Sequence, residues 1–112
     1  MDLDGERVYT NPLADCTMFQ IDLLIVLAEV GPAKGARVGE RLSATRELVE
    51  IYPGQLYPNL DTLVDRGLVT KQAVNRRANH YALSRRGEHA LADFRAYVAR
   101  SVDSVDADGG DA

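Results

Sequence analysis

The stretch 53–84 constrains the fold more than any other part of the chain, because its hydrophobic period changes there from helical to extended. Four apolar residues share one stripe at helical spacing: Leu56, Leu60, Leu63 and Val64. Pro53 suits a first helical position, and Gly67 suits a left-handed helix end. Two short β-favouring runs follow, LVTKQAV and NHYALS, joined by the polar turn NRRA. The pattern predicts a helix that leads directly into a β-hairpin with a basic tip.

Helices are also predicted on both sides of this stretch. Thr17 can cap the segment 18–30, whose apolar positions go most of the way round, so this helix is expected to be buried on more than one side. A shorter helix is expected over 36–46. Ser84 can cap a last helix, which is expected over 85–102. The predicted order is therefore helix, helix, helix, hairpin, helix.

This order predicts a mainly α fold with a small β-hairpin, a winged helix-turn-helix followed by a C-terminal dimerisation helix. Residues 1–16 are expected to form a flexible acidic arm and 17–86 the winged helix-turn-helix. The dimerisation helix is assigned to 87–103, and 104–112 is expected to be an acidic disordered tail.

Charge is distributed very unevenly along the chain. The net charge of −4 by itself argues against a nucleic-acid-binding protein. However, residues 1–33 carry one base and six acids, 34–86 carry ten bases and five acids, and 87–112 carry two bases and six acids. The basic middle coincides with the predicted winged helix. The acidic ends fit either a high-salt cytoplasm or the codon bias of a GC-rich genome.

Phosphate binding requires such local positive charge, and base reading requires side chains with hydrogen-bond donors and acceptors. Helix 53–66 is predicted to enter the major groove, and the wing at 74–79 to reach the backbone or the minor groove. The candidate DNA-binding residues are Lys34, Arg37, Arg41, Gln55, Tyr57, Pro58, Asn59, Thr62, Arg76, Arg77 and His80. Each of these side chains taken alone could equally be ordinary solvated surface.

Apolar residues of the last helix recur at spacings of three and four, which favours packing against another helix. Packing within the same domain is the alternative. We expect a homodimer through this helix and the first one, with the candidate contacts Phe19, Leu23, Leu91, Phe94, Val98 and Val102. Cys16 is the candidate redox residue, since a position just before a helix N-terminus can lower a thiol pKa. An inert small residue is the other interpretation of Cys16.

Other function classes find no support in the sequence. There is no Gly-rich phosphate loop, no Ser/His/Asp group and no Cys/His cluster with zinc spacing, so we expect neither an enzyme nor a metal or cofactor site. The longest apolar run, LLIVLA, is far shorter than the roughly 20 residues that span a bilayer. A cytoplasmic protein without membrane contact is expected.

The segments YPGQLYPNLDTLVDRGLVTKQ and RRANHYALSRRGEHAL closely resemble the PadR family of winged-helix transcriptional regulators. The shared positions are Pro53, Gly54, Leu56, Tyr57, Pro58, Leu60, Leu63, Gly67, Leu68, Val69, Tyr81, Leu83, Ser84 and Gly87. The resemblance covers residues 17–91 and implies a dimeric DNA-binding repressor that often responds to a small molecule or a stress signal. Two features depart from the family: Ala36 stands where an aromatic residue is common, and the C-terminal region is brief.

These observations favour a dimeric, sequence-specific transcriptional regulator that binds double-stranded DNA. The alternative is a winged-helix module that binds another protein, which the net acidity and the two acids Asp61 and Asp65 of helix 53–66 support.

Overall fold

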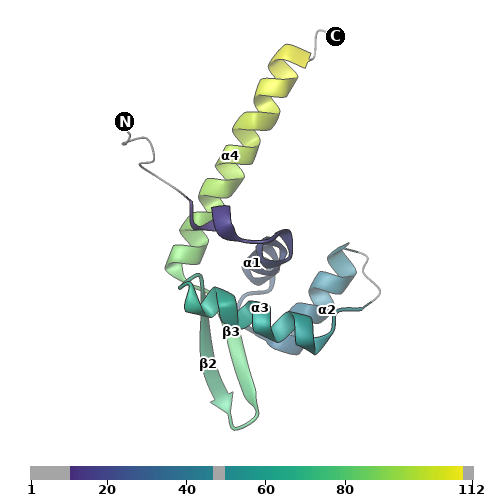
Figure 1. Cartoon of the computed structure of the whole chain (residues 1–112), viewed down its shortest axis with the longest axis vertical. Helices are drawn as coiled ribbons and strands as arrows, with labels where there is room; N and C mark the ends of the chain where they lie inside the picture. Colours follow the sequence, from purple (N-terminus) through teal and green to yellow (C-terminus); the bar gives the residue numbers. More distant parts are fainter. Residues whose placement is uncertain (1–10, 47–49, 110–112) are drawn as a thin grey trace.

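The structure, a computed structural model, describes residues 11–46 and 50–109. Its elements are η2 (Pro12–Asp15), α1 (Met18–Val30), β1 (Ala33–Lys34), α2 (Gly35–Arg46), α3 (Pro53–Asp65), β2 (Val69–Asn75), β3 (Ala78–Leu83) and α4 (Arg85–Gly109). The predicted order of three helices, hairpin and helix is confirmed, and so is the mainly helical winged-helix fold. Figure 1 shows the β2–β3 hairpin and α4 projecting from opposite sides of the body formed by α1, α2 and α3.

Helix α1 lies at the centre of the core. Its buried residues point in several directions, as the all-round apolar pattern predicted, and pack against Val38 and Leu42 of α2 and the leucine stripe of α3. Thr17 caps the helix as predicted, because its hydroxyl accepts from the Gln20 amide while the Gln20 side chain accepts from the Thr17 amide. Buried Asp22 is compensated by Arg46, whose Nε lies 3.3 Å from its carboxylate.

The sheet has three antiparallel strands in the order β1–β3–β2. Strand β1 was not predicted, because two residues in a Gly- and Pro-rich turn carry no local strand signal. It forms only because Ala33 and Lys34 pair with Tyr81 and His80 of β3. This pairing ties the start of α2 to the hairpin, which matters for the site described below.

The hairpin and α4 meet at a tightly packed joint. The Ser84 hydroxyl donates to the Gly67 carbonyl at 2.6 Å and accepts from the Gly87 amide at 2.9 Å, so Ser84 caps α4 as predicted. The Ser84 amide donates to the Leu68 carbonyl at 3.0 Å. A Cβ on Gly87 would lie 2.1 Å from that carbonyl oxygen, so only glycine fits there.

The prediction of a flexible arm over 1–16 is wrong for residues 11–16, and residues 1–10 lie outside the described part of the chain. Pro12–Asp15 form a short 3-10 helix that places Leu13 in the core. The Asn11 side chain donates to the Ala90 carbonyl of α4 at 2.9 Å. These tertiary contacts order a segment whose composition alone suggested disorder.

The prediction of a disordered tail is wrong for residues 104–109, since α4 continues to Gly109, and 110–112 lie outside the described residues. No proline or glycine interrupts the sequence between Gly87 and Gly109, so nothing ends the helix earlier. At 25 residues α4 is about 37 Å long, and it accounts for much of the 54 Å length of the molecule.

Candidate nucleic-acid interface

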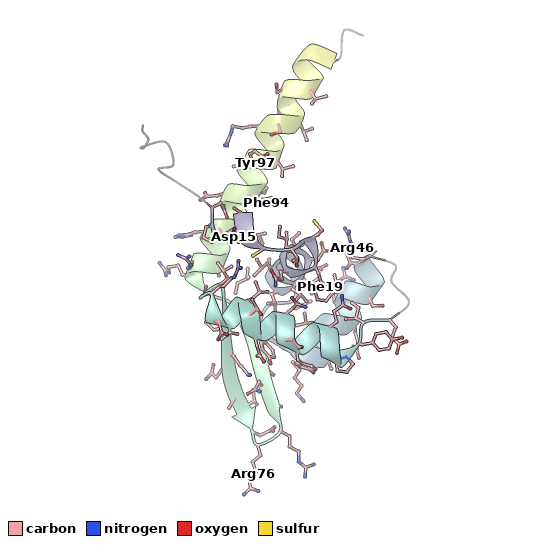
Figure 2. The ribbon with its side chains drawn as sticks, viewed as in Figure 1. Asp15, Phe19, Arg46, Arg76, Phe94 and Tyr97 are labelled. Carbon is pink, nitrogen blue, oxygen red and sulfur yellow. The ribbon has the colours of Figure 1, made fainter. Side chains whose placement is uncertain are left out.

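The tip of the β2–β3 hairpin presents two arginines to solvent. The Asn75 carboxamide accepts from the Arg77 amide at 2.8 Å and so fixes the turn. Arg76 and Arg77 are both exposed, and Figure 2 shows Arg76 projecting beyond the end of the hairpin. The sequence-predicted basic tip is therefore present, on a turn held by a hydrogen bond from Arg77 to Asn75.

Helix α3 presents its polar face next to this hairpin. Leu56, Leu60 and Leu63 are buried, which turns Gln55, Tyr57 and Pro58 toward the exposed side. Thr62 is half-buried, and its hydroxyl donates to the Pro58 carbonyl at 3.0 Å. Pro58 has no amide hydrogen, so it interrupts the backbone hydrogen bonds of α3. The Thr62 hydroxyl binds a backbone carbonyl close to this interruption.

Asn59 has its partners inside the protein. Its carbonyl oxygen accepts from the Gln20 amide group of α1 at 2.9 Å, and its own amide group donates to the Gln55 carbonyl at 2.7 Å. The structure thus places Asn59 against α1 rather than with Gln55 and Pro58 on the exposed face. Its spacing of three from Leu56 already put it at the flank of the apolar stripe, which is the signal that could have indicated this position.

A polar hollow of about 500 Å³ lies between α2, α3 and the hairpin. We call it the wing hollow, and it is lined by Lys34, Gly35, Ala36, Tyr57, Asn75, Arg77, Ala78, Asn79 and Tyr81. The Tyr57 ring lies so close to the backbone of Gly35 that a Cβ there would be 2.4 Å from the ring. Lys34 and Arg77 bring positive charge to it from two separate elements.

Arg37 and Arg41 lie on α2, and Arg41 is engaged by Glu29 of α1. The Arg41 Nε donates to the Glu29 carboxylate at 3.0 Å, and a second guanidinium nitrogen donates to the other oxygen. This hydrogen bond lowers the pKa of Glu29 and raises the pKa of Arg41. Arg37 and the side chain of Arg41 are both exposed, but the charge of Arg41 is paired with that of Glu29.

His80 pairs across the sheet with Lys34 and Gln72, while Tyr81 pairs with Ala33 and Lys71. Because successive strand residues point to opposite faces, His80 lies on the face of the sheet opposite to Tyr81. His80 is not among the residues that line the wing hollow.

One contact at this end of the molecule was not predicted from the sequence. Lys71 of β2 lies with its Nζ 3.2 Å from a carboxylate oxygen of Asp61 on α3 and 5.9 Å from the centre of the Tyr81 ring. The hydrogen bond to Asp61 raises the pKa of Lys71. Neither residue is distinctive in sequence, and the pairing depends on a strand register known only from the fold.

The candidate dimerisation residues divide into two groups. Leu91, Phe94, Val98 and Val102 line an apolar groove of about 910 Å³ together with Ile25 of α1, and this set defines the α4 groove. Val98 and Val102 are 40% and 52% exposed, and Ile25 is 42% exposed. Ile25 was not predicted, since the all-round apolar pattern of α1 does not show which side stays open.

The prediction is wrong for Leu23, which has no exposed surface because it lies in the hydrophobic core. Phe19 is half-buried against the same core and lies outside the α4 groove. Figure 2 shows Phe94 and Tyr97 on α4, well separated in that view from Phe19.

The Cys16 thiol is partly buried. Burial raises its pKa, although the Arg66 guanidinium, 3.7 Å from Sγ, acts in the opposite direction. Burial thus opposes the lowering of the pKa that is expected for a thiol just before a helix N-terminus. Among the residues described, no cluster of three or more His, Cys, Asp or Glu side chains could hold a metal ion. No helix in the described ranges has the length and apolar character that crossing a membrane requires.

Comparison with known proteins gives a consistent result. The model of the transcriptional regulator PadR-like family matches residues 23–93. RosR of H. salinarum is 32% identical, with a TM-score of 0.72 over 88% of this chain and 96% of that chain. No curated protein matches the sequence.

Two more distant structures share the fold. A PadR-like transcription factor of Bacteroides fragilis is 22% identical, with a TM-score of 0.68 over 80% of this chain and 87% of that chain. A probable transcriptional regulator of Pseudomonas aeruginosa is 20% identical, with a TM-score of 0.65 over 93% of this chain and 78% of that chain.

Proposed function

The chain belongs to the PadR-like family of transcriptional regulators, and from this premise we propose that it is a sequence-specific DNA-binding repressor that acts as a homodimer. The observation that carries the proposal is the position of α3 beside a hairpin with two exposed arginines at its tip. The spacing of these elements suits a helix in the major groove with the wing on the adjacent backbone or minor groove.

The residues divide by role. Gln55, Tyr57, Pro58 and Thr62 belong to the helix that enters the groove, and Gln55 offers both a donor and an acceptor to a base edge. Arg76 and Arg77 bind the DNA backbone next to that groove or enter the minor groove. Lys34 and Arg37 neutralise phosphates from the α2 side, and the wing hollow brings Lys34 and Arg77 to one surface.

Three candidates receive supporting roles on the basis of their contacts. Asn59 holds α3 against α1, and Arg41 ties α2 to α1 through Glu29. His80 does not line the wing hollow. We therefore expect their substitution to affect DNA binding less directly than that of Gln55 or Arg76.

The proposed dimer uses the α4 groove. In Figure 1 the distal part of α4 stands clear of the body, and its exposed valines include Val105 at 66% exposure. A row of apolar side chains on a projecting helix favours a second helix as its partner. Two copies joined in this way would present two α3 helices to two half-sites. The apolar lining of the α4 groove also suits the small-molecule effector that the family resemblance implies.

The test begins with selection of bound sequences from a pool of random duplexes, followed by affinity measurements on the selected and a scrambled duplex across a salt series. We expect a palindromic site and an affinity that falls as salt rises. Absence of binding at low salt, combined with a folded protein, would contradict the proposal and favour the protein-binding alternative.

Two variants separate base reading from backbone binding. Gln55→Ala should reduce the difference between the selected and scrambled duplexes, by roughly five- to hundredfold. Arg76→Ala combined with Arg77→Ala should weaken binding to both duplexes to a similar degree. It should also reduce the slope of log affinity against log salt concentration by about 2. Arg100→Ala on α4 serves as the control, because it removes an exposed arginine from the opposite side of the molecule. If every variant lost the same affinity for the selected and the scrambled duplex, the assignment of α3 to base reading in the major groove would be wrong.

A further inference from the structure

The helix that we propose to enter the major groove carries no base of its own. Between Pro53 and Asp65 the only charged residues are Asp61 and Asp65. Asp61 lies on the exposed face, and its side chain is 52% exposed. A carboxylate at such a position would repel the phosphates on either side of the groove unless its charge were compensated.

Lys71 supplies that compensation from β2. Its Nζ lies 3.2 Å from the Asp61 carboxylate, and the same ammonium group stands over the ring of Tyr81, which is buried. Asp61 and Tyr81 therefore hold Lys71 from α3 and from β3, respectively. The pair is neutral overall, so Asp61 can approach DNA without a net penalty from its charge.

The carboxylate keeps acceptor capacity beyond this ion pair. An ionised carboxylate offers about four lone-pair sites and no donor, and the hydrogen bond from Lys71 uses one of its two oxygens. In the major groove the exocyclic amine of cytosine is a donor that carboxylates accept from, whereas guanine at the same position offers only acceptors.

We propose that Asp61 is a specificity-determining residue that accepts a hydrogen bond from the N4 amine of one cytosine in each half-site, with Lys71 as its positioning residue. This inference rests on the proposed function, since it requires α3 in the major groove. Asp61 is one of the two acids that support the protein-binding alternative, and this inference gives it a role in DNA recognition instead.

If the Asp61–Lys71 pair had a purely structural role, its loss would leave the base preference unchanged. Ion pairs between exposed side chains contribute little to folding stability, so loss of the pair should leave the thermal midpoint nearly unchanged. A change in base preference at one position is a readout that a structural tie between α3 and the wing would not produce.

The experiment repeats the selection from random duplexes with wild type, Asp61→Ala, Asp61→Asn and Lys71→Met. Wild type should enrich a C·G pair at one fixed position of each half-site. Asp61→Ala should lose about tenfold of the discrimination at that position and leave the others intact. Asp61→Asn should shift the preference toward adenine, because a carboxamide can donate to N7 and accept from the N6 amine. Lys71→Met should weaken binding to every duplex.

Glu40→Gln is the control, because it removes one exposed negative charge from α2 without touching α3. It should keep the wild-type base profile. An Asp61→Ala profile identical to wild type would overturn the inference while leaving the proposed function in place. Failure of wild type itself to enrich any sequence would overturn the proposed function instead, so the two failures are distinguishable. Thermal unfolding of each variant identifies any loss of fold.

Discussion

The molecule has two exposed ends of opposite character. The wing end comprises α3, the hairpin and the start of α2, and its exposed residues are mostly polar or charged, although Val74 is also exposed. The α4 end comprises the distal part of α4 and Ile25, and its exposed residues include a row of valines. Charged side chains can stay in water without cost to folding, whereas an apolar row in water favours association. The same small core thus supports one surface suited to nucleic acid and another suited to protein.

The largest effect is expected at the α4 end. Replacing Val98 and Val102 by lysine should place two charges in the α4 groove and abolish the proposed dimer, because burying charges at an apolar interface is costly. Loss of the link between half-sites should then lower affinity for a two-half-site duplex by about 10²- to 10⁴-fold. Sedimentation and anisotropy measure the two quantities.

Ala96→Lys is the matched control for that pair, since it adds a lysine to an exposed position of α4 outside the groove. It should remain dimeric. A Val98→Lys, Val102→Lys protein that still sedimented as a dimer would place the interface elsewhere and remove the contrast between the two ends.

The next effect is expected at the joint between the ends. Gly87→Ala places a methyl group 2.1 Å from the Leu68 carbonyl oxygen, and neither backbone segment can move without breaking the Ser84 contacts. We expect a loss of about 3 kcal/mol in the free energy of unfolding, measured by chemical denaturation. Gly54→Ala, where nothing lies within 4 Å, should change stability by less than about 1 kcal/mol. Similar losses for both would show that the joint is not rigid.

A smaller effect is expected in the wing hollow. Gly35→Ala would push against the Tyr57 ring, whose side chain can rotate away because it is 36% exposed. Stability should therefore change by less than about 1 kcal/mol, while loss of a hydroxyl contact to phosphate should weaken DNA binding about tenfold. Tyr57→Phe should give the same loss of affinity. If both variants bound DNA with wild-type affinity, the wing hollow would not contact the DNA backbone.

Features fixed by local chemistry were predictable from the sequence. The caps at Thr17 and Ser84 and the left-handed Gly67 follow from neighbouring residues alone, as do the five main elements and the basic hairpin tip. The helical continuation past residue 103 was missed because acidic composition was given more weight than the absence of a helix breaker.

Features fixed by distant partners were not predictable. Strand β1 depends on β3, and the order of residues 11–16 depends on the core and on Ala90. The same reason explains the site: Asn59 is turned inward by Gln20, 39 positions away, and Arg41 is engaged by Glu29, 12 positions away. Polarity identified these side chains as functional candidates, but only the fold shows what they bind.

The smallest effect concerns the ion pair between Glu29 and Arg41. Arg41 lowers the pKa of Glu29, so the pair stabilises the fold above the ordinary pKa of the carboxyl group, and this contribution disappears as the pH falls through the lowered value. Both side chains are well exposed, so the expected change is small and should shrink further with salt. Between about pH 6 and pH 3, the thermal midpoint of wild type should fall slightly more than that of Glu29→Gln. Arg41→Gln should behave like Glu29→Gln, and the double variant should show no further change, because each substitution removes the same interaction. A full wild-type acid response in Glu29→Gln would mean that Arg41 is available to phosphate after all, which would extend the basic surface of the wing end along α2.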